Sequence, residues 1–340
     1  MNDVFNQKFY NLFNIWLVLL ITLIGLMIVV GGLTRLTDSG LSITKWELFS
    51  GIIPPLSKSD WSTYFDLYKQ VPEYKLQNYS MTINEFKIIF WWEWAHRILG
   101  RIIGISLLLP LIFFSFKLEF KKLKSLYIIF LLVCAQGLMG WYMVTSGLVD
   151  KVDVSHYRLS IHLFIAFVIL SCLIWYFLNH IKELDKNFFT GKSKLFSIKI
   201  FIFLIFLQII LGAFVSGLDA GRIYQTWPLM NESYFPGDIN FRNYNEFLNF
   251  NDSSLVQFVH RNVAYVIFFI LLYMGYKIIR LRFKVLYKSY LYLSIFVLLQ
   301  IFLGILALVT NLHITIASLH QISSIFLIFF SLNFYYKSIN

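Results

Sequence analysis

Eight long apolar runs divide this 340-residue chain, and they limit what it can fold into more than any other feature. They span roughly residues 12–33, 98–116, 125–146, 158–178, 198–218, 258–279, 287–310 and 314–336. A run of about 18 or more apolar residues is long enough to cross a bilayer as a helix. Backbone groups in lipid must be hydrogen-bonded internally, so unbroken runs favour helices. The sequence therefore predicts an all-α integral membrane protein with eight transmembrane helices.

The composition supports this interpretation. Hydrophobic residues make up 58% of the chain and charged residues 14%, whereas about 25% charged residues is usual in soluble domains. The first run has no small-residue cleavage site and is long enough to span, so we expect it to be an uncleaved helix.

The formal net charge of +11 is concentrated in three of the connecting loops. The basic residues there are Lys117, Lys121, Lys122 and Lys124; Lys182, Lys186, Lys192, Lys194 and Lys199; and Lys277, Arg280, Arg282, Lys284 and Lys288. Short loops on the opposite side carry only Lys151 and Arg158. Basic loops stay on the cytoplasmic side, so we expect both termini to be cytoplasmic and loops 34–95 and 219–257 to be external. The basicity reflects topology in a lipid bilayer, and no nucleic-acid partner is expected.

The two halves of the chain resemble each other, which is typical of an internal repeat. The matching segments are 25–35 with 211–222, His96-Arg97 with His260-Arg261, Gln136 and Gly140 with Gln300 and Gly304, and Ser160-x-His162 with Ser318-x-His320. Four helices separate equivalent positions, so both halves have the same orientation. We therefore expect two tandem four-helix bundles related by pseudo-twofold symmetry, an N-terminal half over 1–185 and a C-terminal half over 186–340.

Four histidines at membrane depth are the candidate ligands: His96, His162, His260 and His320. Ionisable residues there are costly and usually functional. The second and fourth helices of each half can present facing imidazoles, and two opposed imidazoles make a six-coordinate haem iron. For one histidine alone, an interfacial helix start with an aromatic belt would be the better explanation. The repeat favours ligation. His156 and His313 remain alternative ligands.

One position breaks the symmetry of the repeat. Glu93 precedes His96 by three residues, whereas Gln257 precedes His260. A carboxylate one helical turn from a ligand is suited to general acid–base catalysis, so Glu93 is the candidate catalytic residue. The alternative is an interfacial carboxylate paired with Arg97. Arg97 and Arg261 are candidate cofactor-binding residues, because guanidinium groups bind carboxylates such as haem propionates bidentately.

Together these motifs make the whole chain resemble the haem A synthase family. The resemblance rests on Gly-Gly-Leu-Thr-Arg35, Glu93-x-x-His96-Arg97, His162, Gln225-Thr-Trp-Pro-Leu-Met230, His260-Arg261 and His320. It is similar to the proteobacterial and mitochondrial branch, because the loop after the first helix has no cysteine pair. The resemblance implies a bacterial inner (plasma) membrane oxidoreductase that acts on a methyl group.

The resemblance also implies an activity and site roles. The family oxidises the C8 methyl of haem O to a formyl group, giving haem A for terminal oxidases. His96 and His162 would hold the substrate haem O, with Glu93 as the essential carboxylate. His260 and His320 would ligate the iron of a resident haem b. A haem O synthase is the expected upstream partner.

Two other functions fit four membrane histidines. A bis-histidine b-type cytochrome would only transfer electrons, and it gives no reason for Glu93 in one half and Gln257 in the other. A haem transporter or assembly chaperone would need no fixed resident haem.

Overall fold

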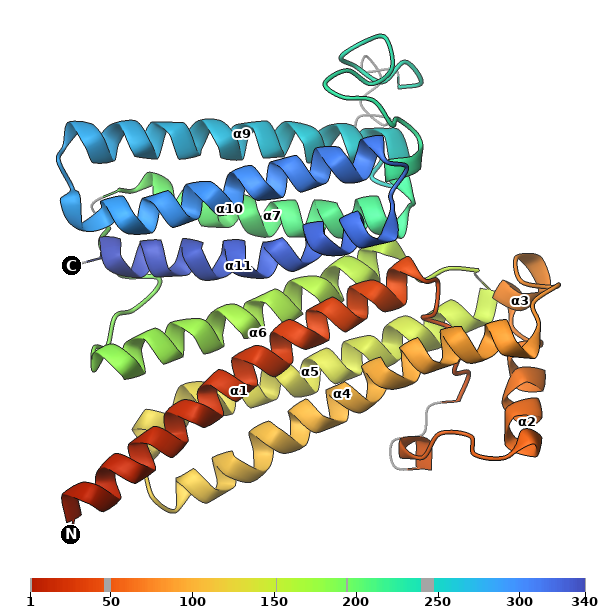
Figure 1. Cartoon of the computed structure of the whole chain (residues 1–340), viewed down its shortest axis with the longest axis horizontal. Helices are drawn as coiled ribbons and strands as arrows, with labels where there is room; N and C mark the ends of the chain where they lie inside the picture. The colour runs from red at the N-terminus through yellow and green to blue at the C-terminus, as the bar shows by residue number, and fades with distance from the viewer. Residues whose placement is uncertain (1, 46–49, 151, 194, 240–247, 340) are drawn as a thin grey trace. The chain divides into compact units, whose positions relative to one another are not determined.

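The computed structural model describes residues 2–45, 50–150, 152–193, 195–239 and 248–339, and these residues form helices with no β-strand (Figure 1). Eight of the helices are long and apolar enough to cross a membrane. They are α1 (Asn2–Leu36), α4 (Ile83–Ser115), α5 (Phe120–Asp150), α6 (His156–Lys182), α7 (Ser197–Gly217), α9 (Ser253–Arg280), α10 (Lys284–Val309) and α11 (Ile314–Ser338). The predicted all-α membrane fold is confirmed.

Helix α4 begins far earlier than its apolar run. It starts at Ile83 rather than at residue 98, because Thr82 and Glu85 form a capping box. The Glu85 carboxylate accepts from the backbone N–H of Thr82 at 2.7 Å, which satisfies a donor that the helix start leaves unpaired. A hydropathy pattern alone does not detect these polar first turns. His96 therefore lies inside a long helix rather than at its mouth.

Contacts between Cα atoms divide the chain into two compact units. One unit contains residues 19–169, and the other contains residues 1–18 and 170–340. In the second unit, α7 packs against α9 and α11, and α10 packs against the same two helices (Figure 1). The division into halves 1–185 and 186–340, related by pseudo-twofold symmetry, stays a prediction.

The first long loop (residues 37–82) is itself folded, with η1 (Ser50–Ile52), α2 (Lys58–Tyr68) and α3 (Pro72–Leu76). Aromatic side chains of α2 pack on the first turns of α4. Trp61 lies 5.0 Å from Phe90 between ring centroids, and Tyr68 stacks on Phe86 at 5.2 Å. Fully burying one such side chain contributes about 1.5–3 kcal/mol, so this cluster fixes the loop to α4.

The two cysteines occupy different environments. Cys134 and Cys172 both stand within apolar runs of the sequence, which predicts small buried hydrophobic residues in helices, and both do lie in helices. Cys172 is partly buried, but Cys134 is exposed on the protein surface. Helix α5 presents much of its surface outward, because lipid solvates apolar side chains that water would not.

A close approach between α9 and α10 depends on Gly275. The hydroxyl of Tyr290 lies where a Cβ at Gly275 would be, and it donates to the carbonyl of Leu271 at 2.9 Å. Small residues allow membrane helices to pack this closely. The glycine thus makes room for a hydrogen bond between the two helices.

Gly275→Ala is therefore expected to displace Tyr290 and to lower the free energy of unfolding by about 1–3 kcal/mol. Thermal unfolding of the purified protein in detergent measures the change. Tyr290→Phe, which loses only the hydrogen bond, should cost about 1 kcal/mol and should relieve part of the clash in the double variant. An unchanged melting temperature for Gly275→Ala would contradict this account of the packing.

Candidate functional site

Each of the four candidate histidines lies against a glycine on a neighbouring helix. A Cβ built on the glycine would approach the imidazole Cε1 at 2.9 Å for Gly31 and His96, 3.1 Å for Gly140 and His162, 3.4 Å for Gly212 and His260, and 2.9 Å for Gly304 and His320. The glycines come from α1, α5, α7 and α10, and the histidines from α4, α6, α9 and α11. Both halves thus use the same pairing of helices, and the missing side chains give the imidazoles their space.

His96 and His162 face each other in the first unit. Their ring centroids are 6.4 Å apart and their planes are inclined by 48°. The Nδ1 atoms of both rings are buried without a hydrogen-bond partner. Gln136 donates its amide to the backbone carbonyl of His162 at 2.9 Å and so joins α5 to α6 beside the ring. The structure brings together the two histidines that the repeat pairs.

His260 and His320 have a different polar environment. The Nε2 of Gln208 lies 3.2 Å from Nε2 of His260, and the Nε2 of Gln300 lies 3.3 Å from Nε2 of His320. Ser323 in turn donates to the side-chain oxygen of Gln300. Each imidazole has a buried Nδ1 without a partner. Gln208 was not identified as a site residue from the sequence.

The two alternative ligands lie at helix starts. His156 begins α6, and its ring lies 4.1 Å from that of Tyr157 between centroids. His313 is the exposed N-cap residue of α11. Neither has the glycine contact that the other four histidines share.

Glu93 is buried, with 3% of its surface exposed, and binds the first long loop. Its Oε1 accepts from Arg97 at 2.6 Å, a salt bridge one helical turn away. Its Oε2 accepts from the Ser42 hydroxyl at 2.7 Å and from the backbone N–H of Ile43 at 2.8 Å. Arg97 also donates to the Ile43 carbonyl at 2.9 Å. The pairing of Glu93 with Arg97, which the sequence offered as the alternative to a catalytic role, is present, and both side chains also bind a latch of loop residues 42–45 that the sequence did not reveal.

The second half has a matching latch without the carboxylate. Gln257, also 3% exposed, donates to the carbonyl of Tyr224 at 3.0 Å. Arg261 donates to the same carbonyl at 2.9 Å. The side-chain oxygen of Gln257 is buried without a partner. The two arginines play the same part in both halves, whereas the residue at the Glu/Gln position differs in charge and in hydrogen bonding.

The loop segments that these latches bind also correspond along the chain. Aligning Gly31 with Gly212 places Ile43 opposite Tyr224, the two residues whose carbonyls the arginines hold. In the same alignment Asp38 corresponds to Asp219, and both have left-handed backbone angles, with φ of 48° and 49°. Extending the repeat from the helices into the loops would have found these residues.

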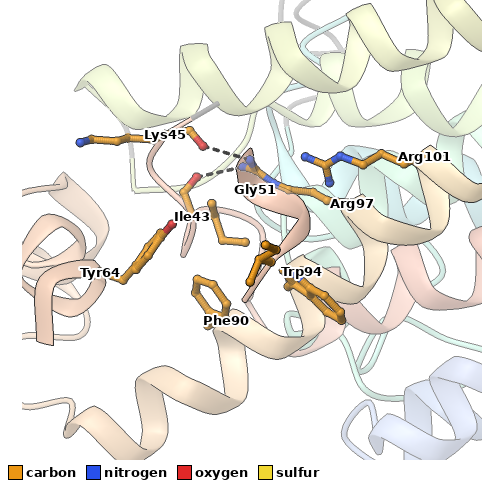
Figure 2. Close-up of a pocket in the computed structure, with 9 residues that line it drawn as sticks. Ile43, Lys45, Gly51, Tyr64, Phe90, Trp94, Arg97 and Arg101 are labelled. Atoms are coloured by element: carbon orange, nitrogen blue, oxygen red, sulfur yellow. Dashed lines mark hydrogen bonds between the residues drawn. The ribbon is translucent and has the colours of Figure 1, made fainter. Parts of the chain in front are cut away.

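A pocket opens beside the first latch (Figure 2). Its polar lining includes three basic side chains, Lys45, Arg97 and Arg101, and its apolar lining includes Tyr64 and Trp94. The guanidinium of Arg97 bonds to loop carbonyls on one side of the pocket (Figure 2). A concave, basic surface with aromatic walls can bind an anionic group of an otherwise apolar ligand.

The two latches predict unequal losses of stability when their arginines are replaced. Arg97→Ala leaves the buried Glu93 carboxylate without its cation, and breaking a buried ion pair in this way costs roughly 3–5 kcal/mol. Arg261→Ala removes only hydrogen bonds to carbonyls, so about 1–3 kcal/mol is expected. Hydrogen exchange of residues 38–45 in the first variant and 219–225 in the second measures the loosening. Equal exchange rates in both variants would rule out a special role for the ion pair.

Comparison with known proteins places the chain in a family. The family model described as cytochrome oxidase assembly protein matches residues 14–332. A "Heme A synthase" of Pelagibacter ubique is 46% identical over 340 residues, covering 98% of this chain and 99% of the relative. One of Maricaulis maris is 44% identical and covers 92% of both chains. One of Rickettsia bellii is 42% identical over 92% of this chain and 94% of the relative. The chain therefore belongs to the cytochrome oxidase assembly protein family.

Proposed function

We propose that this protein is a haem A synthase, a membrane oxidoreductase that converts the C8 methyl of haem O to the formyl group of haem A. The near full-length similarity to relatives named "Heme A synthase" carries this proposal. The two histidine pairs support it, because a substrate haem and a resident haem need two separate binding sites. The product would serve terminal oxidases, in keeping with the description of the family.

The first histidine pair fits a haem iron. An imidazole nitrogen binds a first-row metal at about 2 Å, so two histidines that would hold one iron need rings that lie close together. The distance between the His96 and His162 centroids is 6.4 Å. We assign these two histidines to the substrate haem O. Lys45 and Arg101, which line the pocket with Arg97, are suited to its propionates.

We assign the second pair, His260 and His320, to a resident haem b. Buried Nδ1 atoms without partners and glycines opposite both rings support the assignment. Arg261 would contribute to the same site. Its two described bonds go to the loop carbonyls of Tyr224 and Leu229, so its contribution would be to attach this loop to α9, the helix that carries His260. When bound, the haems supply the redox chemistry.

In this proposal Glu93 is the proton acceptor of the reaction. It lies one turn before His96 on α4, and conversion of a methyl to a formyl group releases hydrogen from the carbon as protons. The carboxylate is anchored by Arg97, Ser42 and Ile43, which keeps it in place near the substrate ligand. Taking up a proton weakens the ion pair with Arg97, so proton uptake and loop attachment are coupled.

We further infer that both termini and the three basic loops are cytoplasmic, in a bacterial inner membrane. The latches and the four histidines then lie toward the external side. Two of the basic residues used in this inference, Lys151 and Lys194, lie outside the described residues. A haem O synthase would supply the substrate.

Extraction of pigments after expression with a supply of haem O tests the proposal. Haem A or its hydroxylated precursor is expected beside bound haem b. Two retained haems b and no haem A would instead indicate an electron carrier. Loosely bound haem alone would indicate a transporter or chaperone.

Glu93→Gln is expected to lower haem A formation by about 100-fold or more, because the amide cannot accept the proton. The reduced-minus-oxidised spectrum of haem b should persist. Ser42→Ala is the matched control, because it removes one hydrogen bond of the latch and keeps the carboxylate. Normal haem A formation in Glu93→Gln would show that Glu93 is not the proton acceptor. An equal loss of haem A formation in Ser42→Ala would show that Glu93 contributes by holding the loop and not by accepting a proton.

The glycine contacts predict which substitutions disturb the haem. Gly304→Ala would bring a Cβ to 2.9 Å from the His320 ring, so the imidazole must turn, whereas Gly212→Ala makes an ordinary 3.4 Å contact with His260. Because the displaced group is the end of a side chain, we expect the fold to survive. Gly304→Ala should change the haem b spectrum and lower haem b retention, and Gly212→Ala should do neither. Identical spectra in both variants would contradict the assignment of His320.

A further inference from the structure

A second buried carboxyl group lies in the first long loop, and the proposed mechanism does not use it. Glu73, on the short helix α3, is 4% exposed, and its Oε2 is buried without a hydrogen-bond partner. The groups whose charges act on it are acidic: Glu93, Asp153 and Asp38. Burying a carboxyl without satisfying it is costly, and an apolar residue would pack there at lower cost.

Burial raises the pKa of Glu73 to about 8. A hydrogen bond with Tyr68 opposes this shift, and the charges of Glu93, Asp153 and Asp38 add to it. Burial likewise raises the pKa of Tyr68, with a further contribution from Glu73. At neutral pH, therefore, Glu73 is protonated in the folded protein, and Tyr68 beside it remains a neutral hydroxyl.

Tyr68 connects this carboxyl to the helix that carries Glu93. Its ring is fully buried and stacks on Phe86, and its hydroxyl accepts from the Asn78 amide at 2.8 Å. Phe86 and Glu93 are seven residues apart on α4, so they share one face of the helix, about 10 Å apart along its axis. Glu73 thus lies beside the first turns of α4, Glu93 lies about two turns further along the helix, and His96 follows Glu93 by about one turn.

Resting on the function proposed above, we propose that Glu73 relays protons between Glu93 and the water around the first long loop. In each transfer Glu73, protonated at neutral pH, first releases its proton to water. The O–H bond of the Glu93 carboxyl then breaks as an O–H bond forms on Glu73, which restores the protonated carboxyl. No electron moves in this step.

Glu73→Gln in the full-length membrane protein tests the relay, with Glu85→Gln as the matched control. Glu85 is an exposed carboxylate in the capping box of α4, where glutamine is also compatible. Haem A formation should fall about tenfold or more in Glu73→Gln and remain unchanged in Glu85→Gln. The wild-type rate should show a step in its pH profile near pH 8, and Glu73→Gln should lack that step.

Infrared spectroscopy tests the same group without relying on activity. The wild type should show the band of a protonated carboxyl at neutral pH, lost as the pH rises through about 8 and absent from Glu73→Gln. An unchanged pH profile in Glu73→Gln, or no such band in the wild type, would overturn the relay. Wild type that makes no haem A under any condition would overturn the proposed function itself, and the relay with it.

The pH dependence of the free energy of unfolding provides a further measurement if Glu73→Gln loses its haem. The folded pKa lies above the unfolded value of 4.5, so the stabilising contribution of Glu73 is complete below about pH 4.5 and is lost as the pH rises through about 8.

Glu73→Asp keeps a titrating carboxyl, so it should retain a step in the pH profile of haem A formation, at a shifted midpoint. Loss of the step in this variant would also overturn the relay.

Discussion

In each half of the chain, hydrogen bonds from one arginine to loop carbonyls attach the long loop to the helix that carries a candidate histidine ligand. In each half the arginine follows the histidine directly, and its Nη2 lies 2.9 Å from the carbonyl of Ile43 or Tyr224. A loop crossing the end of a helix bundle has backbone groups that need partners. The guanidinium supplies several donors in a fixed plane. One side chain therefore attaches the loop to the helix that carries the histidine.

The helices below the latches approach each other through glycine. Membrane helices gain no hydrophobic driving force from packing against each other in lipid, so close contact depends on small residues. At Gly31, Gly140 and Gly304 the space of the missing side chain is taken by an imidazole. Ligand position and helix packing therefore depend on the same residues. This dependence explains why the glycines repeat together with the histidines along the chain.

The sequence predicted the helices and the histidine pairs well because both leave periodic or repeated patterns. The start of α4 was not predicted, because a search for long apolar runs does not detect a capping box or turns that mix polar and aromatic residues. Ser42 also escaped, because its partner lies far away along the chain: Ser42 meets Glu93 only after the loop folds back on α4. Glu73 escaped because its burial depends on how the loop packs. A single sequence gives no periodic signal for such contacts. The correspondence of Asp38 with Asp219 was the signal that the internal repeat extends into the loops.

The difference between Glu93 and Gln257 is sharper in the structure than in the sequence. Glu93 accepts from the N–H of Ile43, whereas Gln257 donates to the carbonyl of Tyr224. The second half shows that a neutral amide can complete such a latch. A buried charge is expensive even when paired, so attachment of the loop alone does not account for a carboxylate in the first half. What the carboxylate adds is a group that can take up and release a proton one turn from His96, and this is the property that oxidation of a bound methyl group requires.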